Sequence, residues 1–314
     1  MKYFLICTFL FCFQFLQAQD FKEEKNITYA TVFSWEGKQQ DLKMDIAYQQ
    51  LNKKLPLVVY IHGGGFQNGN KEGDEFMNPL LAQNGFVVAN IDYRLGFDPS
   101  DQQGIIKAFY RGAQDLDAAL RYLVHNANKY NIDTTAIFIG GSSAGGVLAL
   151  ANAYEKQSEW DAVFPMLHQD LGAVTGAGNS FTDNYSVRGV YSLWGGIIDT
   201  TLISGNDIKA MPVLLVASQS DEVIPYEHAK GESAEFKVLY GSYDIAERFR
   251  KNGGCYDLYF VKDARHGHGF SQAYVVNAIS LFVNDVLSGN CKKTTIENTK
   301  SDNSKFFGDY KSEP

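Results

Sequence analysis

A serine bracketed by glycines, placed between a strand and a helix, constrains the fold of this chain more than any other feature. Gly141, Ser143 and Gly145 fit the pattern G-x-S-x-G. The apolar residues 136–139 before it predict a buried strand, and the Ala/Leu-rich residues 147–153 after it predict a helix. In such a sharp turn a flanking side chain would clash, and the serine oxygen is presented to a ligand. The motif therefore predicts a nucleophilic serine.

The simplest alternative for so short a pattern is a turn with no catalytic role, and a second glycine motif argues against this alternative. Residues 62–66 read HGGGF and follow directly after the apolar residues 57–61. Glycines at the end of a buried strand weaken the strand unless something must approach the backbone closely. Their uncovered N–H groups can stabilise the negative charge on a carbonyl oxygen during acyl transfer, with each donor contributing about 3 kcal/mol. The run therefore predicts an oxyanion hole.

The acid and the base that such a serine needs follow it in the order Ser, Asp, His. Asp221 lies in a loop after the apolar residues 213–217, and His266 lies in a loop after the predicted strand 257–261. This order is the one found on the α/β-hydrolase scaffold rather than on the other serine-hydrolase scaffolds.

Other residues compete for both roles. His268 lies two residues after His266, and we favour His266 because a short loop from the strand would place it at the site. Glu222 and Asp199 are alternative acids, but neither has the Pro-Tyr context that follows Asp221.

Together these motifs resemble the α/β-hydrolase carboxylesterases, in particular the bacterial lipase and esterase group with an HGGG motif. Three further segments add to the resemblance, namely residues 60–66, 90–94 and 111–123. The resemblance implies Ser143 as nucleophile, Asp221 as acid and His266 as base. The N–H groups that it implies for the oxyanion hole belong to Gly64, Gly65 and Ala144. The chain departs from the family at residues 217–220, which read ASQS where such enzymes often have His-Gly.

By the same resemblance, we expect a carboxylesterase (EC 3.1.1.-) that forms an acyl-enzyme without a cofactor or a metal ion. The expected substrates are short-chain or carbohydrate-linked esters of the acetyl or feruloyl type. Phe66, Trp194 and Phe270 lie beside the predicted catalytic loops and are candidates for substrate binding, although core packing explains them equally well. A serine peptidase of the same fold and a non-catalytic binding protein that retains the fold are the alternatives.

The alternation of apolar strand runs with helical patterns predicts an α/β fold. We expect a mostly parallel central sheet with helices on both faces, in one catalytic domain over residues 21–288. Residues 28–33 and 42–48 are predicted to be antiparallel edge strands. Residues 155–186 are expected to form a small cap, and the polar residues 289–314 are expected to lack regular structure.

The amino-terminal residues and the overall charge restrict location and partners. Residues 1–18 have a positive start, an apolar stretch and a small-residue cleavage site, which together predict a signal peptide and export to the periplasm or beyond the cell. The stretch is too short for a stable membrane span. A net charge of −8 argues against nucleic-acid binding. The sequence does not indicate an oligomeric state, nor whether Cys255 and Cys291 form a disulfide.

Overall fold

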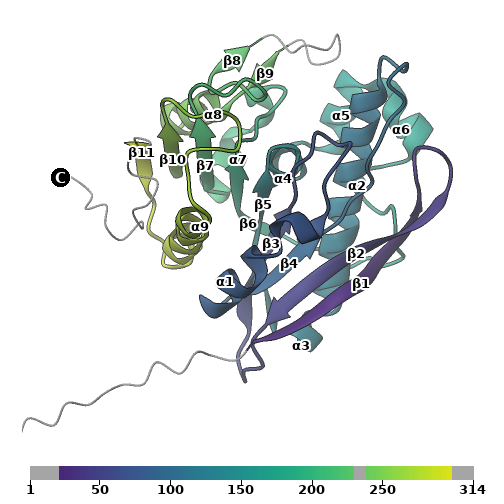
Figure 1. Cartoon of the computed structure of the whole chain (residues 1–314), viewed down its shortest axis with the longest axis horizontal. Coiled ribbons are helices and arrows are strands. Elements are labelled where there is room, and N and C mark those ends of the chain that lie inside the picture. Colours follow the sequence, from purple (N-terminus) through teal and green to yellow (C-terminus); the bar gives the residue numbers. More distant parts are fainter. Residues whose placement is uncertain (1–20, 230–237, 299–314) are drawn as a thin grey trace, which may run out of the picture.

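The computed structural model describes residues 21–229 and 238–298, in which helices cover both faces of a twisted central sheet (Figure 1). Within these residues the sheet has nine strands in the order β1-β2-β4-β3-β5-β6-β7-β10-β11. Their bounds are β1 (Lys22–Phe33), β2 (Gln39–Tyr48), β3 (Leu55–Ile61), β4 (Val87–Ile91), β5 (Ile132–Ser142), β6 (Val187–Leu193), β7 (Val213–Ser218), β10 (Tyr256–Val261) and β11 (Lys293–Asn298). A small separate sheet pairs β8 (His228–Ala229) with β9 (Leu239–Tyr240). The predicted signal peptide, residues 1–18, lies outside the described residues.

The directions of the strands confirm the predicted mostly parallel sheet. Strand β2 is antiparallel to both of its neighbours, β1 and β4, whereas every neighbouring pair from β4 to β11 is parallel. In a parallel sheet the loops after the strands gather at one edge, where open α/β sheets bind ligands. The loops after β3, β5, β7 and β10 carry the predicted site residues to that edge.

Two apolar clusters, one on each face of the sheet, form the core. The helices are α1 (Met77–Gln83), α2 (Gly104–His125), α3 (Ala127–Tyr130), α4 (Ala144–Tyr154), α5 (Gln157–Val163), α6 (Pro165–Leu171), α7 (Gly205–Ala210), α8 (Ser242–Lys251) and α9 (Gln272–Leu287), with the short 3-10 turns η1 (Lys71–Asp74) and η2 (Thr200–Leu202). Leu116 of α2 and Leu148 of α4 belong to one cluster, and Leu81 of α1 and Ile279 of α9 belong to the other. No helix in the described part of the chain combines the length and the apolar character needed to cross a membrane.

The segment predicted to cap the site packs elsewhere, so that prediction was wrong. Residues 155–186 contain α5 and α6, which lie beside α2 at the right of Figure 1. The ring of Trp160 lies 4.8 Å from that of Phe109 and 5.1 Å from that of Tyr110, both on α2. The side chain of Gln114 donates a hydrogen bond of 2.8 Å to the carbonyl of Leu171. The aromatic residues of this segment therefore attach it to α2, and among the described residues none from it lines the cavity around Ser143.

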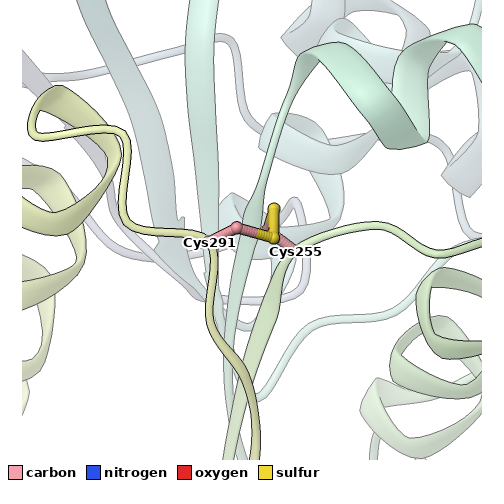
Figure 2. Close-up of a disulfide and its surroundings, with 2 residues drawn as sticks. All are labelled: Cys255 and Cys291. Atoms are coloured by element: carbon pink, nitrogen blue, oxygen red, sulfur yellow. A yellow bond between two sulfur atoms is a disulfide. The ribbon is translucent and has the colours of Figure 1, made fainter.

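Strand β11 corrects the prediction that residues 289–314 lack regular structure. It pairs in parallel with β10, beginning at Tyr256 and Lys293. A disulfide joins Cys255 to Cys291 directly before the two strands, with the Cα atoms 5.1 Å apart (Figure 2). The polar sequence of β11 suits an edge strand, and the covalent bond holds it beside β10. The remainder of the predicted tail, residues 299–314, lies outside the described residues.

Candidate active site

Ser143 occupies a strained turn between β5 and α4. Its φ of 52° and ψ of −120° are rarely adopted by residues other than glycine. The N–H group of Ser143 donates a 2.7 Å hydrogen bond to the carbonyl of Leu193 on β6, which ties the turn to the next strand. A Cβ atom added at Gly141 or Gly145 would lie 2.0 Å from the carbonyl oxygen of Ile61. The two glycines of the motif are therefore required because β3 passes directly beside the turn.

Hydrogen bonds connect the side chains of Ser143, His266 and Asp221 in that order. His266 Nε2 lies 2.8 Å from Ser143 Oγ, and His266 Nδ1 lies 2.7 Å from Asp221 Oδ2. The other carboxylate oxygen of Asp221 accepts hydrogen bonds of 2.8 and 2.9 Å from the N–H groups of Val223 and Ile224. The Asp221 side chain is 2% exposed and that of His266 is 19% exposed. This geometry can transfer the serine proton to a base that a third group orients.

The side chains of the alternative residues take no part in these hydrogen bonds, although Glu222 accepts a 3.4 Å hydrogen bond from the N–H group of His266. His268 is exposed, and its carbonyl accepts a hydrogen bond from the Ser218 hydroxyl. Glu222 is also exposed and forms an ion pair of 2.7 Å with Arg265. Asp199 accepts a 2.8 Å hydrogen bond from the N–H group of Thr201 and caps η2. The structure therefore brings His266 and Asp221, rather than these residues, to Ser143.

The three N–H groups predicted for the oxyanion hole are free to bind a ligand. Within the described part of the chain, the amides of Gly64, Gly65 and Ala144 donate to no other group. Ala144 is the first residue of α4, and the first amides of a helix have no partner within it. Gly64 and Gly65 line the same cavity as Ser143. Gly64 has a φ of +117°, and a Cβ there would lie 1.9 Å from the Asn68 carbonyl oxygen.

His62 supports the glycine loop through its buried ring. Its ring is buried and stacks on that of Tyr93 with the centroids 4.4 Å apart. Its Nδ1 lies 2.7 Å from the carbonyl oxygen of Gly63, so this nitrogen carries a proton and donates it. Burial lowers the pKa of His62, which favours the neutral ring. We assign His62 a structural role in holding the loop, since it does not line the cavity.

The cavity around Ser143 has a volume of about 540 Å³ and is mostly apolar. Trp194 and Phe270, both predicted to bind substrate, line it. Phe66 does not line the cavity, so its predicted role in substrate binding was wrong. It is 5% exposed, and its ring lies 5.6 Å from that of Phe109 on α2. Its φ of 62° belongs to the tight turn that ends the glycine motif, beyond which the side chain enters the core.

Sequence reasoning missed a polar group in the wall of the same cavity. Tyr60, Asp74 and Ser142 line it beside apolar residues such as Met77 and Val275. Tyr60 and Ser142 belong to β3 and β5 at the end of each strand, where polar residues stand out from an apolar run. Asp74 has no comparable signal, because it lies in the loop that follows the glycine motif. In the described part of the chain, no group of three or more His, Cys, Asp and Glu side chains is arranged to hold a metal ion.

Comparison with known proteins assigns the family. The profile of the BD-FAE family matches residues 44–206, just over half of the chain. The chain belongs to the BD-FAE family. This membership confirms the resemblance to α/β-hydrolase esterases.

Other relatives of this BD-FAE protein match shorter segments. Gut esterase 1 of Caenorhabditis elegans is 32% identical over 146 residues, which is 43% of this chain and 25% of that protein. The acetyl esterase of Salmonella schwarzengrund is 34% identical over 98 residues, 31% of this chain and 28% of that protein. The chain thus spans less than a third of the length of these relatives.

Solved esterase structures share the fold of this BD-FAE protein over nearly its whole length. Esterase 2 of Thermogutta terrifontis, phosphorylated by paraoxon, is 18% identical with a TM-score of 0.61, and the match covers 86% of this chain and 95% of that one. A truncated carbohydrate esterase from gut microbiota is 19% identical with a TM-score of 0.60, covering 85% and 96%. At these identities the likeness establishes the fold alone.

Proposed function

We propose that this chain is a serine carboxylic-ester hydrolase that acts through an acyl-enzyme. The observation that carries the proposal is the His266 ring, whose two nitrogens lie within 2.8 Å of Ser143 and Asp221. Membership of the BD-FAE family, next to relatives named as esterases, supports the same reaction.

In the first half of the proposed reaction, Ser143 Oγ attacks the ester carbonyl and His266 Nε2 takes its proton. The tetrahedral intermediate places its oxyanion before the N–H groups of Gly64, Gly65 and Ala144. His266 then gives the proton to the alcohol oxygen as the C–O bond breaks, leaving an acyl group on Ser143.

In the second half, water takes the place of the alcohol. His266 removes a proton from the water, which attacks the acyl carbon, and the proton returns to Ser143 Oγ as the carboxylic acid leaves. Asp221 stays ionised throughout and holds the His266 proton on Nδ1. This orientation leaves Nε2 free to act as the base.

The substrate class that we propose is short-chain or carbohydrate-linked esters, with acetyl and feruloyl groups as the acyl parts. A cavity of about 540 Å³ can hold a compact acyl group together with part of an alcohol. The similarity to an acetyl esterase and to a carbohydrate esterase supports the same substrate class.

The test is hydrolysis of p-nitrophenyl acetate, butyrate and a long-chain ester by the purified chain. Ser143→Ala and His266→Ala should abolish the activity, and His268→Ala is the matched control that should keep it. The acyl series reports the depth of the cavity. Full activity in Ser143→Ala, or no hydrolysis of any ester by the wild-type chain, would overturn the proposal.

We also propose that the protein is exported, with residues 1–18 removed as a signal peptide. The disulfide between Cys255 and Cys291 supports export, because such bonds persist in oxidising compartments. The amino-terminal sequence of the protein recovered from the periplasm or the medium should begin at Gln19. Retention of the full chain in the cytoplasm would contradict this.

A further inference from the structure

A polar group of three side chains interrupts the apolar wall of the cavity beside the nucleophile. The group consists of Tyr60, Asp74 and Ser142. Burial, and after it the negative charge of the nearby Asp74 carboxylate, raises the pKa of Tyr60. All three residues line the cavity that contains Ser143, and Ser142 directly precedes it. The proposed reaction uses none of the three.

The backbone that carries Asp74 is held firmly to the sheet. Asp74 ends η1, which begins at Lys71. The Lys71 N–H group donates a 2.8 Å hydrogen bond to the Asp92 carboxylate, and the Asn90 side chain donates one of the same length to the Lys71 carbonyl. The Lys71 ammonium group lies 3.1 Å from Asp45, and both side chains are 2% exposed. Asp74 is therefore presented from a fixed turn, which keeps the entropy lost on binding a ligand low.

Contact between the Asp74 carboxylate and a hydrocarbon part of a ligand would be unfavourable in this cavity. Phe76, Met77, Leu193 and Val275 line the same cavity. Asp74 is half-buried, and this burial raises the pKa of its carboxyl group. A carboxylate offers about four acceptor positions. An apolar acyl chain in contact with Asp74 would leave positions without a partner, whereas a hydroxyl group of a ligand would satisfy one of them.

We infer that Asp74, which lines the same cavity as Ser143, accepts a hydrogen bond from a substrate hydroxyl next to the ester that Ser143 attacks. Asp74 would then be the residue through which the site distinguishes the carbohydrate-linked esters proposed above from esters of simple alcohols. The inference rests on the proposed ester hydrolysis and adds the residue that reads the alcohol part. Asp74 is a specificity-determining residue here, with no part in the proton transfers.

The experiment compares two substrates that differ in their free hydroxyls. One is a mono-O-acetyl methyl β-xylopyranoside, and the other is the same acetate with its remaining hydroxyls methylated. The ratio of their kcat/KM values is measured for the wild type, Asp74→Asn and Asp74→Ala. Glu75→Gln is the matched control, because this neighbouring carboxylate is exposed and pairs with Lys25 at 3.1 Å.

The wild type should prefer the free sugar acetate by about tenfold or more, the discrimination expected from the loss of one hydrogen bond to a charged group. Asp74→Ala should bring the ratio close to one, mainly through a higher KM for the free acetate. Asp74→Asn, whose amide oxygen can still accept a hydrogen bond but carries no charge, should give a ratio between those of the wild type and Asp74→Ala. Glu75→Gln should keep the wild-type ratio.

Several results would overturn the inference. A wild-type ratio near one would do so without any variant, and so would an Asp74→Ala variant that keeps the wild-type ratio or a Glu75→Gln variant that loses it. If the wild type hydrolyses p-nitrophenyl acetate but neither sugar acetate, the inference fails and the proposed esterase function stands. If it hydrolyses none of the three, the proposed function fails as well.

Discussion

Replacing Asp221 by asparagine tests the orientation of the His266 ring. One carboxylate oxygen of Asp221 accepts from the N–H groups of Val223 and Ile224, and the other faces His266 Nδ1 at 2.7 Å. An asparagine must turn its carbonyl oxygen toward the two N–H donors, because its NH₂ group cannot accept from them. The NH₂ group then faces Nδ1, which moves the ring proton to Nε2. With that proton directed at Ser143, the ring cannot act as a base.

The size of the expected loss in kcat can be estimated from a known catalytic triad. A wrong tautomer imposed by asparagine lowers kcat by about 10⁴ in a serine protease. At about 1.36 kcal/mol for each factor of ten, this corresponds to about 5 kcal/mol of lost transition-state stabilisation. We expect a loss of similar size for Asp221→Asn, since the two N–H donors leave the amide no other orientation.

The assay is kcat for p-nitrophenyl acetate at pH 8, together with the midpoint of thermal unfolding to confirm that the variant folds. Glu222→Gln is the control, because Glu222 is exposed and ion-paired with Arg265, and the amide oxygen of glutamine can still accept the 3.4 Å hydrogen bond from the His266 N–H group. Exposed ion pairs contribute little, so its kcat should stay within about threefold of the wild type. A folded Asp221→Asn variant with more than about a tenth of the wild-type kcat would refute the reasoning about the tautomer.

Three further predictions concern the scaffold. Gly145→Ala should lower the free energy of unfolding by about 1–3 kcal/mol or more and reduce kcat, because its Cβ would lie 2.0 Å from the Ile61 carbonyl oxygen; Gly205→Ala, where nothing lies within 4 Å, should do neither. Reduction of the disulfide, whose cysteines are 36 residues apart, should lower the free energy of unfolding by about 4 kcal/mol in urea denaturation, and an unchanged midpoint would contradict this. Burial raises the pKa of Asp257 to about 6, so the folded chain retains this proton at pH values where the unfolded chain has lost it, and the folded state loses stability between about pH 4 and 6. Asp257→Asn should therefore raise the free energy of unfolding by about 3 kcal/mol at pH 7 and have little effect at pH 3, and an equal effect at both pH values would show the cause to be packing.

Residues whose roles follow from local backbone chemistry could be identified from the sequence. The glycines around Ser143 and the apolar runs before Asp221 and His266 each belong to a strand and the loop at its end. Parallel strands bring such loops to one edge, so the order along the chain was enough to expect a shared site. The choice between His266 and His268 depended on the path of one loop. The sequence favoured His266, and in the structure Nε2 of His266 lies 2.8 Å from Ser143 Oγ.

The wrong predictions have a common physical cause. Phe66 stands next to the glycine motif, but the direction of its side chain depends on a positive φ that cannot be predicted from the sequence. Residues 155–186 were expected over the site because of their length and position, whereas Trp160 and its aromatic partners bury them against α2. In both cases tertiary packing, rather than local pattern, selected the position of an aromatic side chain.

Strand β11 and Asp74 could not be found for a different reason. Residues 293–298 are too polar to predict a strand by themselves, and their pairing depends on the neighbouring β10 and on the disulfide. Asp74 belongs to no motif, and it reaches the cavity because contacts with distant strands hold η1 in place. Features created by contacts between remote segments leave little trace in a single sequence.

The positions of Ser143, Asp221 and His266 along the chain have a consequence for how the protein acquires activity. The three residues follow β5, β7 and β10, with β6 between the first two in the sheet. Contacts between residues so far apart in sequence form slowly, because long loops must close before they can stabilise the structure. A nascent or partly refolded chain can thus contain the complete turn at Ser143 and remain inactive. The appearance of hydrolysis during refolding would time the moment at which the last parallel strands acquire their correct register.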